Sequence, residues 1–485
     1  MAFIDGTVVT VALPVLQKSF EATMAQVQWV VESYALLLAA LLLLGGSLGD
    51  RYGRRLIYLT GVAVFTAASV WCGLSPSIHQ LIVARAIQGI GAALLVPGSL
   101  AIISASFNEK DRGRAIGTWS GFSAITTGVG PILGGWLVQH LSWRWAFFIN
   151  LPLAIAVMGL SILHVPESRN EEDQAKLDWP GAFLATCALG LLVFGLIESS
   201  GRGWSNPLVF GSILAGLVLL AAFIMWEGHS PSPMMPLGLF RSRTFSGANL
   251  VTLFLYTALG GALFFFPFNL IQVQGYTPTE AGAALLPLII LMFFLSRWTG
   301  GLVHRYGSRR PLVVGPLIAG CGFALFAVPG VGGSYWRAFF LPVSMLGLGM
   351  AVSVAPLTTT VMSAASIDKA GVASGINNAV SRVGSLLAVA LFGVILAYVF
   401  GSRLDASLST LDMDPAVYRS IVDQKSKLAG IAIPPAAPAR LATRLRQGIF
   451  GSYVAGFRWI MVTSAFLAFL SAVSSWIMLS GKERT

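Results

Sequence analysis

The sequence predicts an all-α transmembrane fold, on the basis of its composition and the lengths of its apolar segments. Hydrophobic residues make up 55% of the 485 residues and charged residues only 11%, against about 25% in typical soluble domains. Apolar segments of roughly 20 residues recur along the chain, long enough to cross a hydrocarbon core of about 30 Å as helices. An outer-membrane barrel would show shorter alternating strands, so we predict a helical bundle.

The apolar segments predict about fourteen spans. In chain order they lie at residues 1–17, 27–49, 56–75, 79–105, 113–139, 143–164, 179–198, 207–227, 246–272, 280–303, 311–329, 336–363, 371–400 and 452–480. The first span is short, and no basic region precedes it, so we expect no cleavable signal peptide.

Polar connections divide these spans into three groups. We predict an N-terminal six-helix bundle (1–164), a two-helix insert (179–227) and a C-terminal six-helix bundle (246–485). The linkers at 165–178 and 228–245 are expected to be cytoplasmic, and a long extracytoplasmic loop is predicted at 401–451.

One short loop repeats and indicates that the chain consists of two related halves. Gly46–Arg55 reads GSLGDRYGRR, and Gly300–Arg310 reads GGLVHRYGSRR. A second pair of similar segments begins at Arg112 (RGRAIGTWSGFSA) and Lys369 (KAGVASGINNAVS). Parallel six-helix repeats are a known transporter plan, with the substrate site near the midplane between the halves.

The basic residues fix the expected orientation. The net charge of +11 lies in connections between spans, which argues for membrane topology and against nucleic-acid binding. Short connections on one side carry only Lys18, Arg144, Arg202 and Arg337, while the opposite side carries most of the other basic residues. Basic short loops stay cytoplasmic, so both termini are expected on the cytoplasmic side of the cytoplasmic membrane.

The sequence contains no enzyme motif that we recognise. Phosphate-binding, zinc-protease and serine-hydrolase patterns are all missing, which favours a transporter without a cofactor. Cys72, Cys187 and Cys321 each lie alone in an apolar segment, so we expect packing residues and no metal site.

Four ionisable residues fall inside predicted spans, where each is a functional hypothesis because burial in lipid is costly. Asp5, Glu32, Arg85 and Arg382 are therefore candidates for proton coupling, and Asp5, Glu32 and Arg382 also for the substrate cavity. Acids and bases at similar depths can neutralise one another, and protonation of the acid would rearrange the pair. The alternatives are that Asp5 faces the cytoplasm, that Glu32 lines an outer vestibule, and that the two arginines are structural ties.

Two further features lie within the spans or at their ends. The fifth span contains GVGPILGG, in which Gly130, Pro131, Gly134 and Gly135 predict close helix packing and a bend. Glu227 falls at a span end, where a solvated or interfacial position is expected.

These segments together resemble the major facilitator superfamily, and specifically its fourteen-helix drug:proton antiporter branch of the EmrB/QacA type. GSLGDRYGRR resembles the loop signature between helices two and three, LIVARAIQGIGAA the fourth-helix motif and GVGPILGG the fifth-helix antiporter motif. FIDGTVVTVALP and WRWAFFINLP are similar to the first-helix and sixth-helix motifs of this branch. His304 departs from the pattern, because the second copy of the loop signature usually has an acid there.

The resemblance implies specific positions in a gating loop. Asp50 would face Arg54 and the N-terminus of the thirteenth helix near Ala370. The other loop residues would allow a close approach or anchor the loop: Gly46, Gly49, Gly53, Arg51 and Arg55.

The resemblance also implies functions for the residues within the spans. Arg85 and Asp5 would belong to the coupling apparatus, and Gly130, Pro131, Gly134 and Gly135 would shape a bend associated with export.

We therefore expect a proton-coupled antiporter that exports amphipathic drugs or toxic compounds by alternating access between the two bundles. Its expected partners are the lipid bilayer, a small-molecule substrate, protons and an optional periplasmic adaptor, with no nucleic acid. The alternatives are an exporter of a dedicated metabolite, such as an antibiotic, a lipid or a siderophore, and a non-transporting membrane sensor or scaffold.

Overall fold

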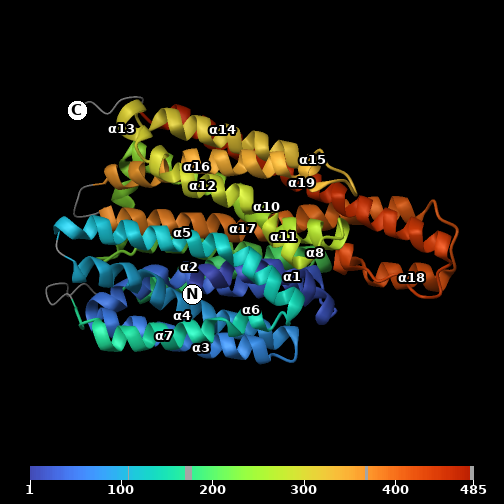
Figure 1. Cartoon of the computed structure of the whole chain (residues 1–485), viewed down its shortest axis with the longest axis horizontal. Helices are drawn as coiled ribbons and strands as arrows, with labels where there is room; N and C mark the ends of the chain where they lie inside the picture. Colours follow the sequence, from blue (N-terminus) through green and yellow to red (C-terminus); the bar gives the residue numbers. More distant parts are fainter. Residues whose placement is uncertain (108, 170–176, 366–369, 481–485) are drawn as a thin grey trace.

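The structure is a computed structural model that describes residues 1–107, 109–169, 177–365 and 370–480. Within these ranges the chain is helical and contains no strand. Most helices run side by side along the long axis of the molecule (Figure 1). Twelve helical stretches of the described chain are long and apolar enough to cross a membrane, which confirms the all-α transmembrane fold.

The first part of the chain forms seven helices. They are α1 (Ala2–Ser19), α2 (Met24–Tyr52), α3 (Arg54–Leu74), α4 (Ile78–Ser106), α5 (Glu109–His140), α6 (Trp145–Phe148) and α7 (Asn150–His164). Helix α4 packs closely on both α2 and α3 because glycines remove side chains at the contacts. A Cβ at Gly91 would overlap the backbone of Phe65, and one at Gly89 would lie 3.1 Å from the Cα of Tyr34.

The insert consists of α8 (Trp179–Arg202) and α9 (Pro207–His229). Each begins with a side-chain cap and a proline in its first turn: Asp178 caps α8 and Asn206 caps α9. Helix α9 packs on α8, and α8 contacts both α2 and α17. The insert is therefore attached to both parts of the molecule through α8.

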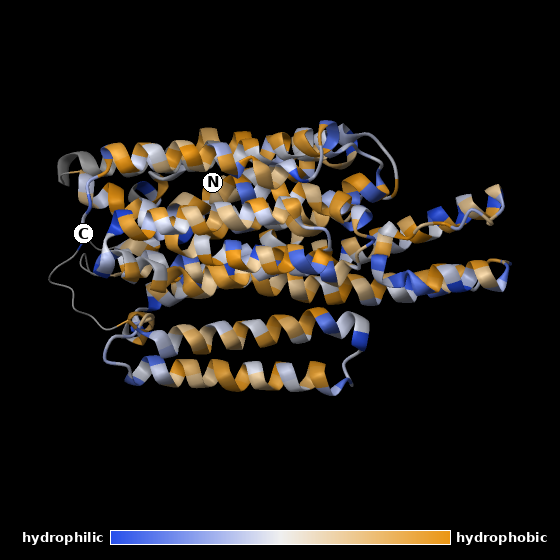
Figure 2. Ribbon diagram, turned by 90° about the horizontal axis from the view of Figure 1, so that it is seen from below, coloured by the Kyte–Doolittle hydropathy of each residue, from blue (hydrophilic) through white to orange (hydrophobic). Residues whose placement is uncertain are grey.

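The last part of the chain has more breaks in its helices. It comprises η1 (Leu237–Arg241), α10 (Arg243–Phe268), η2 (Asn269–Val273), α11 (Pro278–Ala283), α12 (Leu286–Thr299), α13 (Leu302–Tyr306), α14 (Arg309–Phe326), α15 (Tyr335–Ala338), α16 (Phe340–Ser363), α17 (Ala370–Leu408), α18 (Pro415–Asp423), η4 (Lys425–Gly430) and α19 (Ala439–Met478). Hydrophobic residues dominate the long helices, and hydrophilic residues gather towards their ends (Figure 2).

Two helices are much longer than their predicted spans. Helix α17 has 39 residues and α19 has 40, so each is about 60 Å long, roughly twice the hydrocarbon thickness. Both continue into the segment predicted as a loop at 401–451 and project beyond the other helices, and α18, which connects them in the chain, lies to one side of the projecting ends (Figure 1). The predicted spans follow apolar character, which ends before these helices do, so the segment predicted as a loop at 401–451 contains helical stretches.

Two of the predicted spans, α1 and α5, are not among the twelve stretches of membrane length and hydropathy. Helix α1 has only 18 residues and carries Asp5 and Lys18. The count of fourteen spans therefore stays a prediction for these two helices.

Candidate functional site

A buried polar network joins four helices in the first part of the chain. Arg85 on α4 donates from Nη1 to Asp5 Oδ2 on α1 at 2.6 Å, and both side chains are at most 1% exposed. Gln88 and Asn150 donate to Asp5 Oδ1 at 2.9 and 3.1 Å. Asn150 also donates to Ser69 on α3 at 3.0 Å. The carboxylate of Asp5 is therefore surrounded by donors and has a buried cation beside it.

The helical periodicity explains why these side chains meet. Arg85 and Gln88 are three residues apart on α4, so they lie on one face, and Arg85 also donates to Gln88 Oε1 at 2.7 Å. Asn150 opens α7 directly after the break at Ile149, and Ser69 donates to the carbonyl of Phe147 in α6 at 2.8 Å. The break between α6 and α7 thus places one amide side chain against Asp5.

The guanidinium of Arg85 has contacts beyond the ion pair. Its Nε donates to the carbonyl of Val30 on α2 at 3.1 Å, and its plane lies 4.1 Å from the ring centre of Tyr34. A compact ammonium would not reproduce a stacked, multiply bonded guanidinium. Removing one partner of a buried pair costs about 3–5 kcal/mol, so Asp5 and Arg85 depend on each other.

Glu32 lies apart from this network. Its side chain is 1% exposed, its Oε2 has no hydrogen-bond partner, and it joins no ion pair within the described chain. Glu32 lies on α2 one turn from Gln28, which donates to the carbonyl of Val389 on α17 at 2.7 Å, and one turn from Leu36, which packs with residues of α8 and α17. Glu32 therefore faces the contact of α2 with α8 and α17.

Arg382 on α17 is the fourth predicted intramembrane charge. Its Nε is buried and has no hydrogen-bond partner in the described part of the chain. No ion pair joins Glu32 and Arg382 in the described residues.

The predicted gating loop is a sharp turn between α2 and α3. Gly53 has φ +116°, a conformation that favours glycine, and Arg54 donates from Nε to Asp50 Oδ1 at 2.8 Å. The N-terminus of α17 near Ala370, which the resemblance places opposite Asp50, borders residues 366–369, and these lie outside the described residues.

Sequence reasoning missed Glu167, which caps α3 from the linker after α7. Its carboxylate accepts the backbone N–H groups of Arg55 and Leu56 at 2.9 and 3.0 Å, while Arg55 donates to the carbonyl of Val165 at 2.9 Å. The signal for it was indirect: α3 begins directly after Gly53 without a side-chain cap of its own. Glu167 therefore ties the linker to the loop.

Replacing Glu167 with alanine is expected to lower the free energy of unfolding by about 1 kcal/mol, the usual cost of losing a helix cap. Thermal melting of the purified chain measures this change. Glu167→Gln keeps one acceptor and should melt between the wild type and Glu167→Ala. An unchanged melting temperature in Glu167→Ala would contradict the capping assignment.

The glycine-rich segment of α5 packs on two other helices. A Cβ at Gly130 would overlap the side chain of Thr7 on α1, and one at Gly134 would lie 2.8 Å from the Cα of Val8. On another side, α5 contacts α11. A Cβ at Gly135 of α5 would overlap the backbone of Pro278, and a Cβ at Gly282 of α11 would overlap the backbone of Pro131. These residues let α5 contact α1 and α11 at backbone distance, and the bend associated with export stays a prediction.

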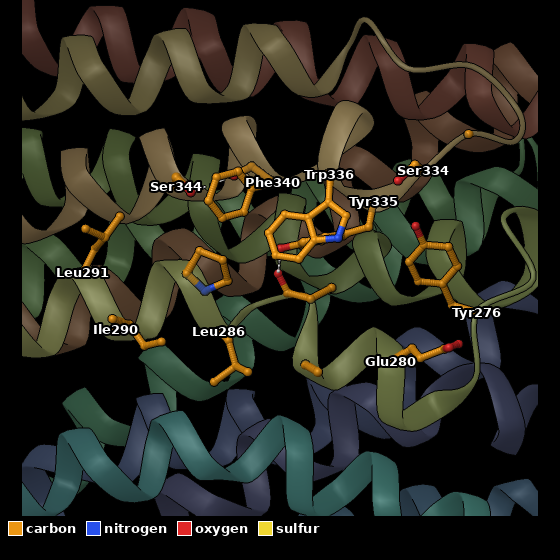
Figure 3. A pocket seen from close by; sticks show the side chains of 14 residues that line it. Tyr276, Glu280, Leu286, Ile290, Leu291, Ser334, Tyr335, Trp336, Phe340 and Ser344 are labelled. Carbon is orange, nitrogen blue, oxygen red and sulfur yellow. Dashed lines mark hydrogen bonds between the residues drawn. The ribbon is translucent and has the colours of Figure 1, made fainter.

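Sequence reasoning also missed an apolar cavity of about 980 Å³ between α11, α12, α15 and α16. Leu286, Ile290, Trp336 and Phe340 line it, and Tyr276 and Glu280 lie at one end (Figure 3). Tyr335 donates its hydroxyl to the carbonyl of Ala284 at 2.7 Å. Burial raises the pKa of Tyr335 to about 12, so this hydroxyl stays protonated at neutral pH.

A second, polar cavity of about 1120 Å³ lies where α2, α8, α17 and η4 meet. Its lining includes Gln28 and two ion pairs, Arg202 with Glu198 at 2.8 Å and Lys425 with Asp405 at 2.6 Å. Since Gln28 is one helical turn from Glu32, this polar cavity approaches the unpartnered carboxylate.

Comparison with known proteins gives consistent results. The sequence profile of the Major Facilitator Superfamily matches residues 1–389. The chain is 34% identical to the tetracenomycin C resistance and export protein of Streptomyces glaucescens, over 97% of this chain and 88% of that protein. It is 37% identical to the multidrug resistance protein Stp of Mycobacterium tuberculosis, over 90% and 80% of the two chains.

A solved structure shares the fold. A bacterial homologue of the human lysosomal transporter Spinster, in an inward-facing and unoccupied conformation, aligns with a TM-score of 0.61 at 20% identity over 99% of this chain and 95% of that one. The expectation of a transporter rather than an enzyme is confirmed by the family match. The chain is a multi-pass membrane protein that belongs to the Major Facilitator Superfamily.

Proposed function

We propose that the chain is a proton-coupled antiporter that exports amphipathic toxic compounds across the cytoplasmic membrane. It belongs in this proposal to the fourteen-helix drug:proton branch, with both termini cytoplasmic. The names of its relatives, a resistance and export protein and a multidrug resistance protein, support the substrate class. Bundles 1–164 and 246–485 alternate access, and the insert 179–227 stays attached through α8.

One observation carries the proton coupling. Glu32 is buried, and its Oε2 has no hydrogen-bond partner among the described residues. Glu32 faces the contact between the two bundles, and the polar cavity at Gln28 approaches it. An unpaired carboxylate in a low-dielectric site is destabilised by its charge, so binding a proton stabilises it. Taking up and releasing that proton would favour different arrangements of α2 and α17.

The network of Asp5 and Arg85 has a different part in this proposal. Asp5 has donors from three residues, so it is held as a charged group inside the first bundle. We assign Arg85 and Tyr34 to coupling this charged group to the rest of the first bundle. Arg382, the buried charge of α17, takes part in coupling from the second bundle. Asp50 and Arg54 act in the gating loop, and the glycines of α5 allow the bundles to close.

Alternating access requires the contacts between the bundles to break and reform. Gln17 at the end of α1 donates to the carbonyl of Lys427 at 3.1 Å and accepts from Gln272 at 2.8 Å. Thr279 donates its backbone N–H to Gln139 Oε1 at 3.3 Å. These hydrogen bonds would have to break for this end of the molecule to open.

Efflux from proteoliposomes tests the proposal. Proteoliposomes that contain the purified chain are loaded with ethidium, a lipophilic cation. They are expected to release ethidium several times faster when a pH gradient is imposed than without one. Efflux that ignores the gradient would overturn the proton coupling. No efflux from a chain with a cooperative thermal transition would overturn the broad substrate class.

One observation favours export of a single metabolite as the second candidate. The relative from Streptomyces glaucescens is named for one compound, tetracenomycin C. A panel of chemically unrelated amphipathic dyes distinguishes the two functions, because a dedicated exporter would transport one scaffold and leave the others unchanged. An adaptor that binds the projecting ends of α17 and α19 is proposed for either case.

A further inference from the structure

Two carboxyl groups face each other at one end of the two-helix insert. Asp178 precedes α8 and Glu227 lies in the last turn of α9, and they are 7% and 3% exposed. Burial of Glu227 differs from the solvated or interfacial position expected from the sequence. The reason is that the chain after α9 turns back, so that Met235 contacts Glu227.

One oxygen of each carboxyl group accepts hydrogen bonds from N–H groups. Asp178 Oδ1 accepts the N–H of Gly181 at 2.9 Å and the indole N–H of Trp226 at 2.7 Å. Glu227 Oε2 accepts the backbone N–H of Met235 at 2.9 Å. These bonds hold both carboxyl groups in place, and they do not involve Asp178 Oδ2 or Glu227 Oε1.

The other two oxygens face each other. Asp178 Oδ2 and Glu227 Oε1 are buried and receive no N–H or O–H donor from the described residues. A Cβ at Gly181 would lie 2.7 Å from the first and 2.8 Å from the second, so both oxygens border the same point beside Gly181. Two carboxylate oxygens only accept hydrogen bonds, so they can bond to each other only if a proton lies between them.

The described charged groups around the pair do not neutralise it. His229 directs its ring towards the carbonyl of Met225, and Arg243 donates to the carbonyl of Ile477. Arg241 on η1 forms no ion pair with Asp178 or Glu227 within the described residues. Residues 170–176, which precede Asp178, lie outside the described residues.

We propose that Asp178 and Glu227 bind one proton between Asp178 Oδ2 and Glu227 Oε1, forming a proton site in the insert. The site is separate from Glu32 and does not depend on the proposed transport function. Its proton comes from solvent and returns to it. While bound, it joins the start of α8 to the end of α9 and to Met235. When it leaves, two negative charges face each other in a buried position.

A divalent cation is the competing ligand, and the geometry favours the proton. Magnesium and calcium require six or more oxygen ligands. The described residues contain no group of three or more His, Cys, Asp or Glu side chains that could hold a metal ion. Asp178 and Glu227 together offer only two free carboxylate oxygens, Asp178 Oδ2 and Glu227 Oε1.

Infrared spectroscopy of the purified full chain tests the proposal directly. The wild type at neutral pH is expected to show a protonated carboxyl C=O band that shifts in D₂O and is lost in Glu227→Gln. Glu198→Gln is the matched control, because Glu198 lies at the opposite end of the same insert in an ion pair with Arg202. A spectrum in which Glu227→Gln and Glu198→Gln are indistinguishable would overturn the shared proton.

Thermal melting supplies the second test. As the pH rises from about 5 to about 8, the melting temperature of the wild type is expected to fall, because the shared proton is lost. The melting temperature of Glu227→Gln should fall less, by a margin of about 2 °C or more, because its amide keeps a permanent N–H donor. Equal pH dependence in both chains would contradict the proposal. If Mg²⁺ stabilises the wild type at about pH 8 but does not stabilise Glu227→Gln, the site binds a metal ion and the proposed proton site is wrong. If Glu227→Gln does not fold, Asp178→Asn in the infrared experiment decides.

Discussion

Replacing Arg85 with lysine is expected to slow gradient-driven efflux at least about tenfold, which corresponds to about 1.4 kcal/mol. The guanidinium bonds Asp5, Gln88 and the carbonyl of Val30 at once while it stacks 4.1 Å from the ring centre of Tyr34. A lysine keeps the charge near Asp5 but loses the planar fork and the stacking. Initial rates of ethidium efflux with and without a pH gradient measure the loss.

The matched control is Arg144→Lys. Arg144 also stacks on an aromatic ring, Trp143 at 4.4 Å, but lies outside the buried network. Its efflux should equal that of the wild type. Unchanged efflux in Arg85→Lys would reduce Arg85 to a structural tie, the alternative that the sequence leaves open.

A charge-neutral double variant separates stability from transport. Asp5→Asn alone leaves Arg85 buried without a counter-charge, so its free energy of unfolding should fall by about 3–5 kcal/mol. Asp5→Asn combined with Arg85→Gln removes both charges and should melt above Asp5→Asn. If the double variant melts above the single variant but does not respond to the pH gradient, the pair acts in coupling. If it responds normally, the pair acts only in folding.

The sequence identified the charges that lie buried within the helices better than it predicted how they are paired. Asp5 and Arg85 stand out because charged residues are rare within spans. Their contact joins positions 80 residues apart, so no local pattern could predict it. Gln88 and Asn150 complete the network but are uncharged, and a hydropathy profile barely registers them. A polar residue matters here through its place in the packed bundle.

Helices α17 and α19 extend beyond the predicted spans for a common reason. The predicted loop at 401–451 was placed where apolar residues thin out, yet α17 continues to Leu408 and α19 begins at Ala439. Alanine, arginine and leucine in these segments favour helix in water as well as in lipid. Hydropathy therefore locates the membrane-embedded part of a helix and not its ends.

The sequence did not predict the contacts that linkers make with distant helix ends, and it did not predict the contact between Asp178 and Glu227 for the same reason. Glu167 caps α3 from beyond α7, and Met235 bonds Glu227 from beyond α9. In each case a polar connection returns to a helix end, and its backbone or side chain satisfies a group there. Such returns depend on the tertiary path of the chain, which composition does not encode.

Replacing Glu32 with glutamine is expected to abolish the response to the pH gradient while leaving the fold intact. Glutamine has the same shape, and the Oε2 of Glu32 has no hydrogen-bond partner to lose. The neutral amide mimics the protonated carboxyl group permanently, so the site cannot exchange a proton. Efflux of ethidium should proceed at the same rate with and without the gradient, at least several-fold below the driven rate of the wild type.

Two measurements distinguish loss of coupling from loss of binding. Ethidium binding to purified Glu32→Gln should match the wild type, and exchange of ethidium across the liposome membrane without a gradient should persist. Glu21→Gln is the control, since Glu21 is 84% exposed and only its ion pair with Lys427 at 3.5 Å is lost. If gradient-driven efflux persists in both Glu32→Gln and Asp5→Asn, neither acid acts in the coupling mechanism. If it is lost in Glu32→Gln alone, the coupling proton binds at the contact between α2 and α17.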